Sequence, residues 1–461
     1  MPAFFWLLAA FSIVVSPAFL PLVGVKTDTK SYRIVLVVFA LAALLPLFGF
    51  GTPGVVWQIL LAETILFVAF IFVSRWRNRA SNTLHMLASI ASNGGWFLVM
   101  YVLANQYQHE HAALASGAFS REALGFFAVV IAGVLGGRLV GMQWSLRIEE
   151  YLEVETNGVK SKRLSRFDPL VIPALTAAIF ACIVGYGLVS PALSHDVSVV
   201  MLLSVVQNGA YALKTRLGNR NHVGWAAVAA IVAALSFIVQ WGYLLHYTAE
   251  GGSMPLALAV PYTVATVVGS VFGANISMWF EKVWGIEAEK NQKPVDLIGQ
   301  PLFRFVLGSV GAFCLLYLFF GNALLALVGV APHPLSFPFP LFAGTAWERP
   351  ATLVLAGLVF CLQEVSHTLA STAGNRSDAE PGRASFLRSQ AAYHALICLF
   401  YGAITFSKDI FVIFSPHLID LVPVYIFGNV LGQFFGQTIN YKITKALGFV
   451  MNVPPAKKAK A

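Results

Sequence analysis

The sequence predicts an all-α, polytopic membrane protein, and three features of the chain predict it. Of the 461 residues, 58% are hydrophobic and only 11% are charged, whereas an average soluble domain has roughly 25% charged residues. Apolar runs long enough to cross a bilayer recur along the chain, and most Lys and Arg residues stand in the short segments between them. This composition excludes a water-soluble enzyme of this size, which needs more charge on its surface, and a disordered chain, which needs low hydrophobicity.

The membrane spans are predicted from the length of the apolar runs. A helix needs about 20 mainly apolar residues to cross a hydrocarbon core about 30 Å thick, and by that measure we predict about thirteen spans. We treat the first as a span and not as a cleaved signal peptide, because no basic residue precedes it and no clear cleavage site follows. The spans are expected at approximately 3–23, 34–50, 55–73, 83–103, 123–146, 169–190, 197–213, 224–246, 255–280, 303–329, 351–370, 389–407 and 419–441.

The basic residues predict the orientation, because cytoplasmic loops retain Lys and Arg. With the N-terminus outside, the outside loops hold only Arg121, Arg349 and Lys408, and one further basic residue, Arg138, lies within a span. We therefore expect a multi-pass protein of the bacterial inner membrane with its C-terminus in the cytoplasm. The remaining Lys and Arg form a basic collar that attracts anionic lipids at the cytoplasmic face. A protein partner also fits the collar, whereas nucleic acid does not, because the chain has no basic groove with interleaved aromatic residues.

Two short motifs recur three times in the same order. The first begins at Ser74, Thr215 and Ser371, at the end of an apolar span. The second is a row of small residues two spans later, followed in two copies by a glutamate and in the third by Thr444. The polar residues that we assign to the motifs are Arg75, Asn78, Arg79, Glu149, Arg216, Asn219, Arg220, Glu281, Asn375 and Arg376.

These motifs predict an internal triplication. We expect a leading transmembrane helix with its inside loop at 1–33, then repeats at 34–168, 169–302 and 303–461, the last with a basic C-terminal tail. Each repeat contains four spans, so all three point the same way across the membrane. Repeats that point the same way are related by an axis along the membrane normal. The sequence therefore predicts a pseudo-threefold arrangement.

The rows of small residues predict close helix packing. In lipid, small side chains let helix backbones approach one another. We favour this interpretation over the alternative, in which the three rows converge on the pseudo-axis and leave a narrow pathway. The rows are Gly133, Gly137 and Gly141, then Ala265, Gly269 and Gly273, then Gly428, Gly432 and Gly436.

The Asn-Arg pairs at the inside helix ends have two interpretations. They are favoured as local caps, because a cation stabilises a helix C-terminus. Alternatively, Arg79, Arg220 and Arg376 bind an anion, a lipid phosphate or a partner, for which guanidinium groups offer bidentate contacts. Glu149 and Glu281 are candidates to pair with these arginines.

Polar residues inside the apolar spans are the best local indication of function, because burial in lipid is costly unless they face a partner or water. Glu364 and His367 share one helix face. A proton-linked transporter could use them as a titrating pair, because His changes charge near neutral pH. An internal ion pair or a hydrogen-bonded contact between helices is the favoured alternative. The intramembrane polar candidates are Glu63, Arg138, Gln207, Asn208, Gln363, Glu364 and His367.

Enzymatic chemistry has little support in the sequence. Cys182, Cys314, Cys361 and Cys398 lie in apolar stretches without metal-ligand spacing and are expected to be buried packing residues. The outside segment 109–111, His-Glu-His, lacks a third placed ligand, so we expect a solvated loop and no metal. The chain has no nucleotide-binding or nucleophile motif in a suitable inside domain. We expect no catalytic residues and no cofactor.

The repeat unit resembles functionally uncharacterised small membrane proteins of bacteria and phages. In these proteins one helix ends in Ser/Thr-Arg-x-x-Asn, and a later helix carries small-xxx-Gly-xxx-Gly before an acidic residue. The first copy matches with Ser74, Arg75, Asn78 and Glu149. The third copy departs from the pattern at Thr372 and Thr444, which suggests specialisation. The resemblance supplies no activity and favours a viral or mobile-element origin.

Two functions therefore remain from the sequence. The first is a permease or channel-like protein for an unidentified small solute or ion, with a path near the repeat interface. The second is a non-transporting scaffold or host-interaction protein that serves assembly or exclusion. Water-accessible polar residues at mid-membrane favour the first, whereas apolar seams with all charges paired favour the second.

Overall fold

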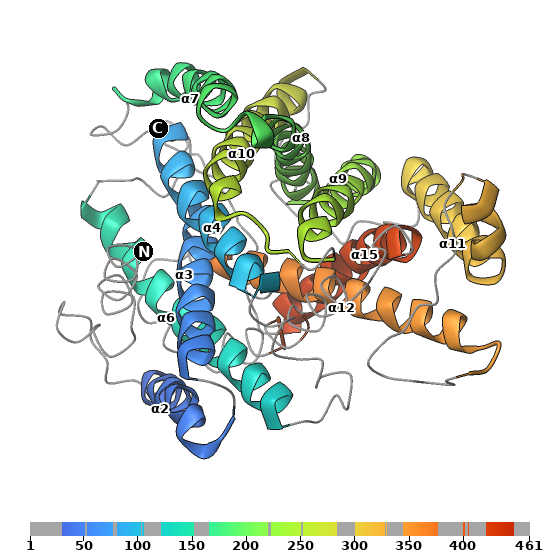
Figure 1. Cartoon of the computed structure of the whole chain (residues 1–461), viewed down its shortest axis with the longest axis horizontal. Coiled ribbons are helices and arrows are strands. Elements are labelled where there is room, and N and C mark those ends of the chain that lie inside the picture. Colours follow the sequence, from blue (N-terminus) through green and yellow to red (C-terminus); the bar gives the residue numbers. More distant parts are fainter. Residues whose placement is uncertain are drawn as a thin grey trace, which may run out of the picture.

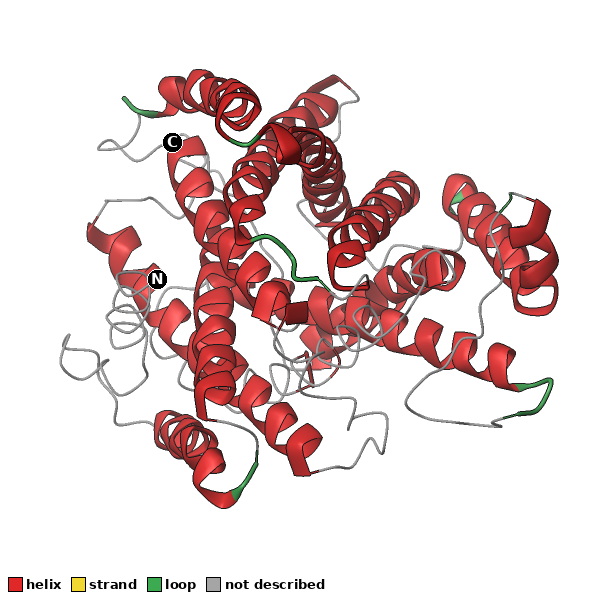
Figure 2. Cartoon of the chain, in the orientation of Figure 1, coloured by secondary structure: helices red, strands yellow, loops and turns green. Residues whose placement is uncertain are grey.

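The chain folds into helices throughout the part that the structure describes (Figure 2). A computed structural model describes residues 30–50, 53–76, 81–102, 104–105, 121–151, 166–219, 223–249, 252–283, 300–327, 329, 344–376, 400–401, 404 and 421–446. Within these ranges no strand occurs, and short 3-10 turns lie at Leu45–Phe48, Pro191–Leu193 and Leu256–Leu258.

Long helices form the body of the molecule (Figure 1). Their bounds are α2 Lys30–Leu44, α3 Pro53–Trp76, α4 Asn82–Val102, α6 Arg121–Tyr151, α7 Asp168–Val189, α8 Ser194–Asn219, α9 Val223–Ala249, α10 Ala259–Val283, α11 Pro301–Leu327, α12 Glu348–Arg376 and α15 Val422–Ala446.

These helices confirm the prediction of an all-α, polytopic membrane protein. Among the described residues, 7 helices are long and apolar enough to cross a membrane, and α3 and α7 to α12 contain them. Each predicted span coincides with a described helix, except 3–23 and most of 389–407, which lie outside the described residues. The exact number of thirteen spans stays a prediction.

The helices pair in a recurring order. α3 packs on α6, α8 on α10 and α12 on α15, so each helix that carries the first motif lies against a helix that carries the row of small residues. α4 connects the first pair to the second by packing on α3 and α10, and α9 connects the second to the third by packing on α8 and α15. The relation of the three repeats by symmetry stays a prediction.

The glycines lie where these helix pairs are closest. A Cβ atom on Gly133 would lie 2.6 Å from the Cβ of Glu63, and one on Gly137 would overlap the carbonyl oxygen of Thr64. In the third pair a Cβ on Gly432 would overlap the carbonyl oxygen of Cys361. Any larger side chain at these positions would push the two backbones apart, because helix backbone lies on the other side of the contact.

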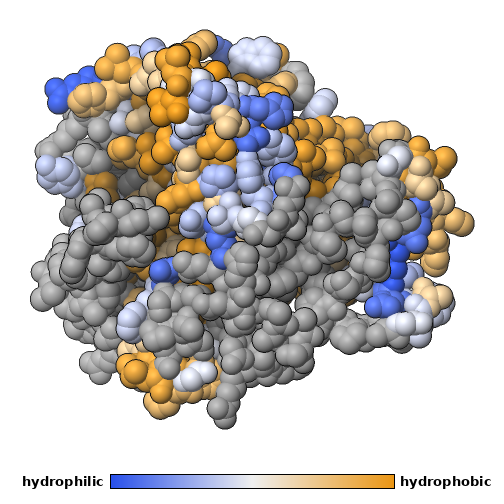
Figure 3. All heavy atoms as spheres, viewed as in Figure 1, coloured by the Kyte–Doolittle hydropathy of each residue, from blue (hydrophilic) through white to orange (hydrophobic). Residues whose placement is uncertain are grey.

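Three helices, α2, α7 and α11, lie on the rim of the molecule (Figure 1) and pack against α6, α10 and α15 respectively. Their outer faces are apolar and exposed, with Leu188 78% exposed on α7 and Phe305 71% exposed on α11. Figure 3 shows hydrophobic residues over the upper and right-hand rim of this face. Exposed apolar helix faces in a membrane protein are those that meet the lipid.

Polar contacts fix the helix ends. The Asp168 carboxylate at the start of α7 accepts hydrogen bonds from the Thr83 backbone N–H at 3.0 Å, the Thr83 hydroxyl at 2.7 Å and the Ser81 hydroxyl at 3.0 Å. It thereby caps the first turn of α4, where backbone N–H groups have no partner within the helix. Asp196 ties α8 to α9 by accepting hydrogen bonds from the hydroxyls of Tyr243 and Tyr247.

The structure corrects the predicted end of the span at 197–213. α8 continues to Asn219, so Lys214 and Arg216, which the sequence analysis placed in the basic collar, lie within the helix and are 4% and 8% exposed. A hydropathy window ends a span at the first charged residue. The helix continues here because these side chains face other helices and not the lipid.

The other motif residues are only partly described. Asn78, Arg79 and Arg220 lie outside the described residues, and the side chains of the remaining ones do too, although their backbone is helical. The predicted pairing of the repeat arginines with Glu149 and Glu281 therefore stays a prediction. Cys182, Cys314 and Cys361 are buried free thiols, whereas Cys398 lies outside the described residues.

Candidate functional site

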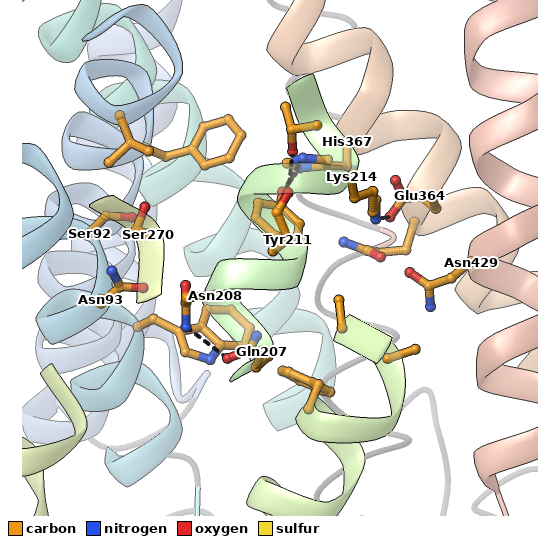
Figure 4. Close-up of a pocket in the computed structure, with 18 of the residues that line it drawn as sticks. Ser92, Asn93, Gln207, Asn208, Tyr211, Lys214, Ser270, Glu364, His367 and Asn429 are labelled. Carbon is orange, nitrogen blue, oxygen red and sulfur yellow. Dashed lines mark hydrogen bonds and ion pairs between the residues drawn. The ribbon is translucent and has the colours of Figure 1, made fainter. Parts of the chain in front are cut away.

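A cavity of about 200 Å³ lies at the centre of the helix bundle. Residues of α3, α4, α8, α9, α10, α12 and α15 line it, so all three helix pairs and both connecting helices contribute. Figure 4 shows how polar side chains from opposite sides point toward this space.

A buried ion pair crosses the cavity wall between α8 and α12. The Lys214 ammonium lies 2.8 Å from the Glu364 carboxylate, and the two side chains are only 5% and 4% exposed. A single charge buried at this depth would cost several kcal/mol, but each of these charges is compensated by the other. The pair therefore links two of the predicted repeats and leaves this part of the wall without net charge.

His367 has different partners. Its imidazole shares hydrogen bonds with the hydroxyls of Tyr211 on α8 and Tyr401, and its ring packs edge-on against Phe70 on α3 at a centroid distance of 5.4 Å. His367 and Glu364 thus line one cavity, as their common helix face predicts. Glu364 forms an ion pair between helices, and the use of Glu364 and His367 as a titrating pair stays a prediction.

Five amide side chains supply further polar groups in the wall. Asn93, Asn208 and Asn429 come from α4, α8 and α15, and each donates an Nδ2–H to the carbonyl oxygen four residues earlier in its helix, at 2.9, 3.2 and 2.9 Å. Asn208 also donates to the Gln207 side-chain oxygen at 2.9 Å. Gln363 completes the set of amides.

Aromatic rings form the apolar part of the wall. Phe237 on α9 stacks on Tyr425 of α15 with ring centroids 5.5 Å apart, and Trp96 on α4 lies near the buried Trp241 of α9 at 6.5 Å. Tyr262 on α10 packs against Trp241 at 5.8 Å. Offset and edge-on aromatic pairs of this kind stabilise a fixed geometry. The cavity wall is thus built on a packed aromatic cluster.

Corresponding positions of the three motif helices meet at this cavity. When the chain is aligned on Ser74, Thr215 and Ser371, three sets of matching residues fall one or two turns before the motif. All of them line the cavity. The sets are Leu66, Gln207 and Gln363, then Phe67, Asn208 and Glu364, then Phe70, Tyr211 and His367.

The structure brings Gln207, Asn208, Gln363, Glu364 and His367 together in the wall of this cavity. That they line a solute pathway stays a prediction. Glu63 and Arg138 are also buried, at 3% and 4% exposure, but they belong to the α3–α6 pair and do not line this cavity. The small residues of the three rows do not line it either.

Several lining residues are not among those that the sequence predicts. Lys214 follows Gln207 by seven residues and Tyr211 by three, so helical spacing places all three on one face. This helical spacing could have predicted that Lys214 shares the cavity with Gln207. Asn93 and Asn429 are single amides within spans, and nothing in their local sequence separates them from packing residues.

Comparison with known proteins gives one partial match. The model of a protein family described as polysaccharide biosynthesis protein matches residues 28–134. This range contains α2, α3, α4 and the first part of α6, and none of α7 to α15. No curated protein and no solved structure matches the chain. The resemblance to uncharacterised bacterial and phage membrane proteins stays a prediction.

Metal chemistry has no visible support at the site. Among the described residues, no group of three or more His, Cys, Asp or Glu side chains is placed to hold a metal ion. The cavity offers hydrogen bonding from amides and hydroxyls, apolar contact with aromatic rings, and the ion pair between α8 and α12.

Proposed function

We propose that this protein is a permease that moves a small solute across the membrane through the central cavity. The observation that carries the proposal is a partly open cavity between the helices, with the polar side chains of Gln207, Lys214 and Glu364 in its wall. Polar groups at such positions are expensive in lipid and typically mark solute pathways. The scaffold hypothesis instead requires apolar seams at the centre of the bundle.

The cavity also has the position that a transporter requires. Repeats that point the same way form binding sites where they meet, and alternating access then needs only rocking of one repeat against another. The Lys214–Glu364 pair lies across such a junction, so its formation and release would favour one of two arrangements. The match of residues 28–134 to a polysaccharide biosynthesis family agrees with a membrane-embedded role.

Thiol labelling tests this proposal without knowledge of the solute. In a chain whose four cysteines are replaced by Ser, Gln207→Cys should react with a small, charged thiosulfonate added on either side of a membrane vesicle. Leu202→Cys is the matched control, because Leu202 lies on the same helix and is 66% exposed on the apolar side. Its thiol should stay unreactive in lipid.

Three results are informative. Reaction of Gln207→Cys from both sides supports transport. If it reacts from one side only, the cavity is closed to the other side and the proposal is wrong. Equal, slow reaction of Gln207→Cys and Leu202→Cys would show a closed interior and favour the scaffold.

We also propose the bacterial inner membrane as the location, with the N-terminus outside and anionic lipids bound to the basic collar at the cytoplasmic face. A green fluorescent protein fused after residue 461 should then fluoresce, because it folds in the cytoplasm. A dark fusion at normal expression would contradict this orientation.

A further inference from the structure

The asparagine side chains present oxygen atoms to the cavity. In Asn93, Asn208 and Asn429 the Nδ2 group is held by a carbonyl oxygen one turn earlier in the helix. This bond fixes the amide and leaves its Oδ1 atom as an acceptor, which accepts no hydrogen bond from any residue in the described ranges. The three amides come from three helices around one space (Figure 4). The cavity is therefore suited to a ligand with several hydrogen-bond donors.

The wall has little net charge to offer such a ligand. Lys214 and Glu364 are the oppositely charged residues that line the cavity, and their contact at 2.8 Å compensates both charges. A charged solute would have to break this pair or be buried without a counter-charge, and either event is costly. The wall therefore favours a neutral ligand.

Aromatic rings supply the flat contact surface. Trp96, Phe237 and Tyr425 line the same space as the amides. The face of an aromatic ring carries partial negative charge, which attracts the partly positive C–H groups on the flat side of a saturated ring. Aromatic faces beside amide oxygens fit a ligand that has C–H groups on its faces and hydroxyl groups on its edge.

The volume limits the size of the ligand. A cavity of 200 Å³ is smaller than the roughly 300–1,000 Å³ of pockets for drug-sized molecules. A space of this size suits one small ring.

We propose that the cavity binds a single neutral, hydroxyl-rich ring, namely a monosaccharide or a cyclic polyol, either free or as the headgroup of a lipid. The inference rests on the proposed transport function and names its substrate class. The carbonyl oxygens of Asn93, Asn208 and Asn429 accept hydrogen bonds from hydroxyls, the aromatic rings contact the ring face, and the closed ion pair discriminates against charged analogues.

Calorimetric titration of the full chain tests the substrate class. The chain is placed in phosphatidylcholine nanodiscs without sugar detergent and titrated with glucose, N-acetylglucosamine and myo-inositol. A second sample set contains monoglucosyl diacylglycerol in the disc, which separates a lipid headgroup from a free sugar. Glucosamine and glucose 6-phosphate are the charged controls. At least one neutral compound should bind saturably, and the charged forms about tenfold more weakly, which corresponds to about 1.4 kcal/mol.

Two variants assign the binding to the cavity. Trp96→Ala should weaken the affinity about tenfold or more, because it removes an aromatic face, whereas Trp347→Ala should leave the affinity unchanged because Trp347 is 63% exposed and away from the cavity. Asn208→Leu, which keeps the size of the side chain but removes its oxygen, should act like Trp96→Ala.

The outcomes separate the two proposals. If no neutral ring compound binds in either form, or the charged analogues bind equally well, the substrate class is wrong. Thiol labelling of Gln207→Cys from both sides would in that case leave the transport function standing. If labelling itself fails from both sides, the transport function is wrong whatever the titration gives.

Discussion

At the scale of single residues, the Lys214–Glu364 ion pair is a buried contact in the cavity wall. Both side chains are almost fully buried and come from helices of different predicted repeats. Breaking a buried pair by removing one charge leaves the other uncompensated, whereas replacing both with apolar residues of similar volume is often neutral.

We therefore predict that Glu364→Gln lowers the free energy of unfolding by about 3–5 kcal/mol. The double variant Lys214→Met with Glu364→Met should recover most of the loss. Reversible unfolding in mixed micelles measures both. Losses that simply add, or a Glu364→Gln variant as stable as the wild type, would contradict a compensated pair.

The sequence predicted five of the residues that line this cavity, and the reason is physical. Gln207, Asn208, Gln363, Glu364 and His367 are recognisable because a polar residue inside an apolar run needs an explanation. The partners of Glu364 and His367 could not be assigned, because they depend on which helix faces meet.

At the scale of helices, the rows of small residues set the distance between α3 and α6, between α8 and α10 and between α12 and α15. Backbone lies directly opposite Gly137, whereas Gly185 on the rim helix α7 has no atom within 4 Å of its added Cβ. Both glycines lie in helices, so a change to Ala raises the helix propensity at both positions. A difference between the two variants therefore reports the contact between helices at Gly137.

Gly137→Ala should destabilise the chain by about 1–3 kcal/mol, because overpacking forces the helices apart. Gly185→Ala should be neutral or stabilising by up to about 1 kcal/mol, since Ala is the better helix former. Unfolding measured under the same conditions tests the pair of variants. Equal effects at the two positions would show that α3 and α6 are not in backbone contact.

Helix positions were more predictable than helix ends. The predicted spans match the described helices because twenty apolar residues form one crossing whatever their partners. The end of α8 was wrong because Lys214 and Arg216 are buried against protein, and a hydropathy window does not distinguish a lipid environment from a polar interior.

At the scale of the whole molecule, the same order of helix pairs occurs three times around one cavity. α2, α7 and α11 lie at separate parts of the rim (Figure 1), and matching residues of α3, α8 and α12 line the centre. A threefold axis along the membrane normal would produce both features from a triplicated sequence.

Spin labels on the rim helices test this symmetry. Labels at Leu41, Phe180 and Leu316, which are exposed on α2, α7 and α11, should give three pairwise distances of similar length in lipid nanodiscs. One distance much longer than the other two would contradict the pseudo-threefold arrangement. That result would not test the central cavity.

An experimental density map of the full chain in lipid nanodiscs tests the central claim most directly. We expect a cavity at the centre of the bundle, bounded by Gln207, Glu364 and Asn429, with Lys214 in contact with Glu364. A centre filled by interlocked Leu and Phe side chains or by lipid acyl chains, with no polar cavity elsewhere between the helices, would contradict it.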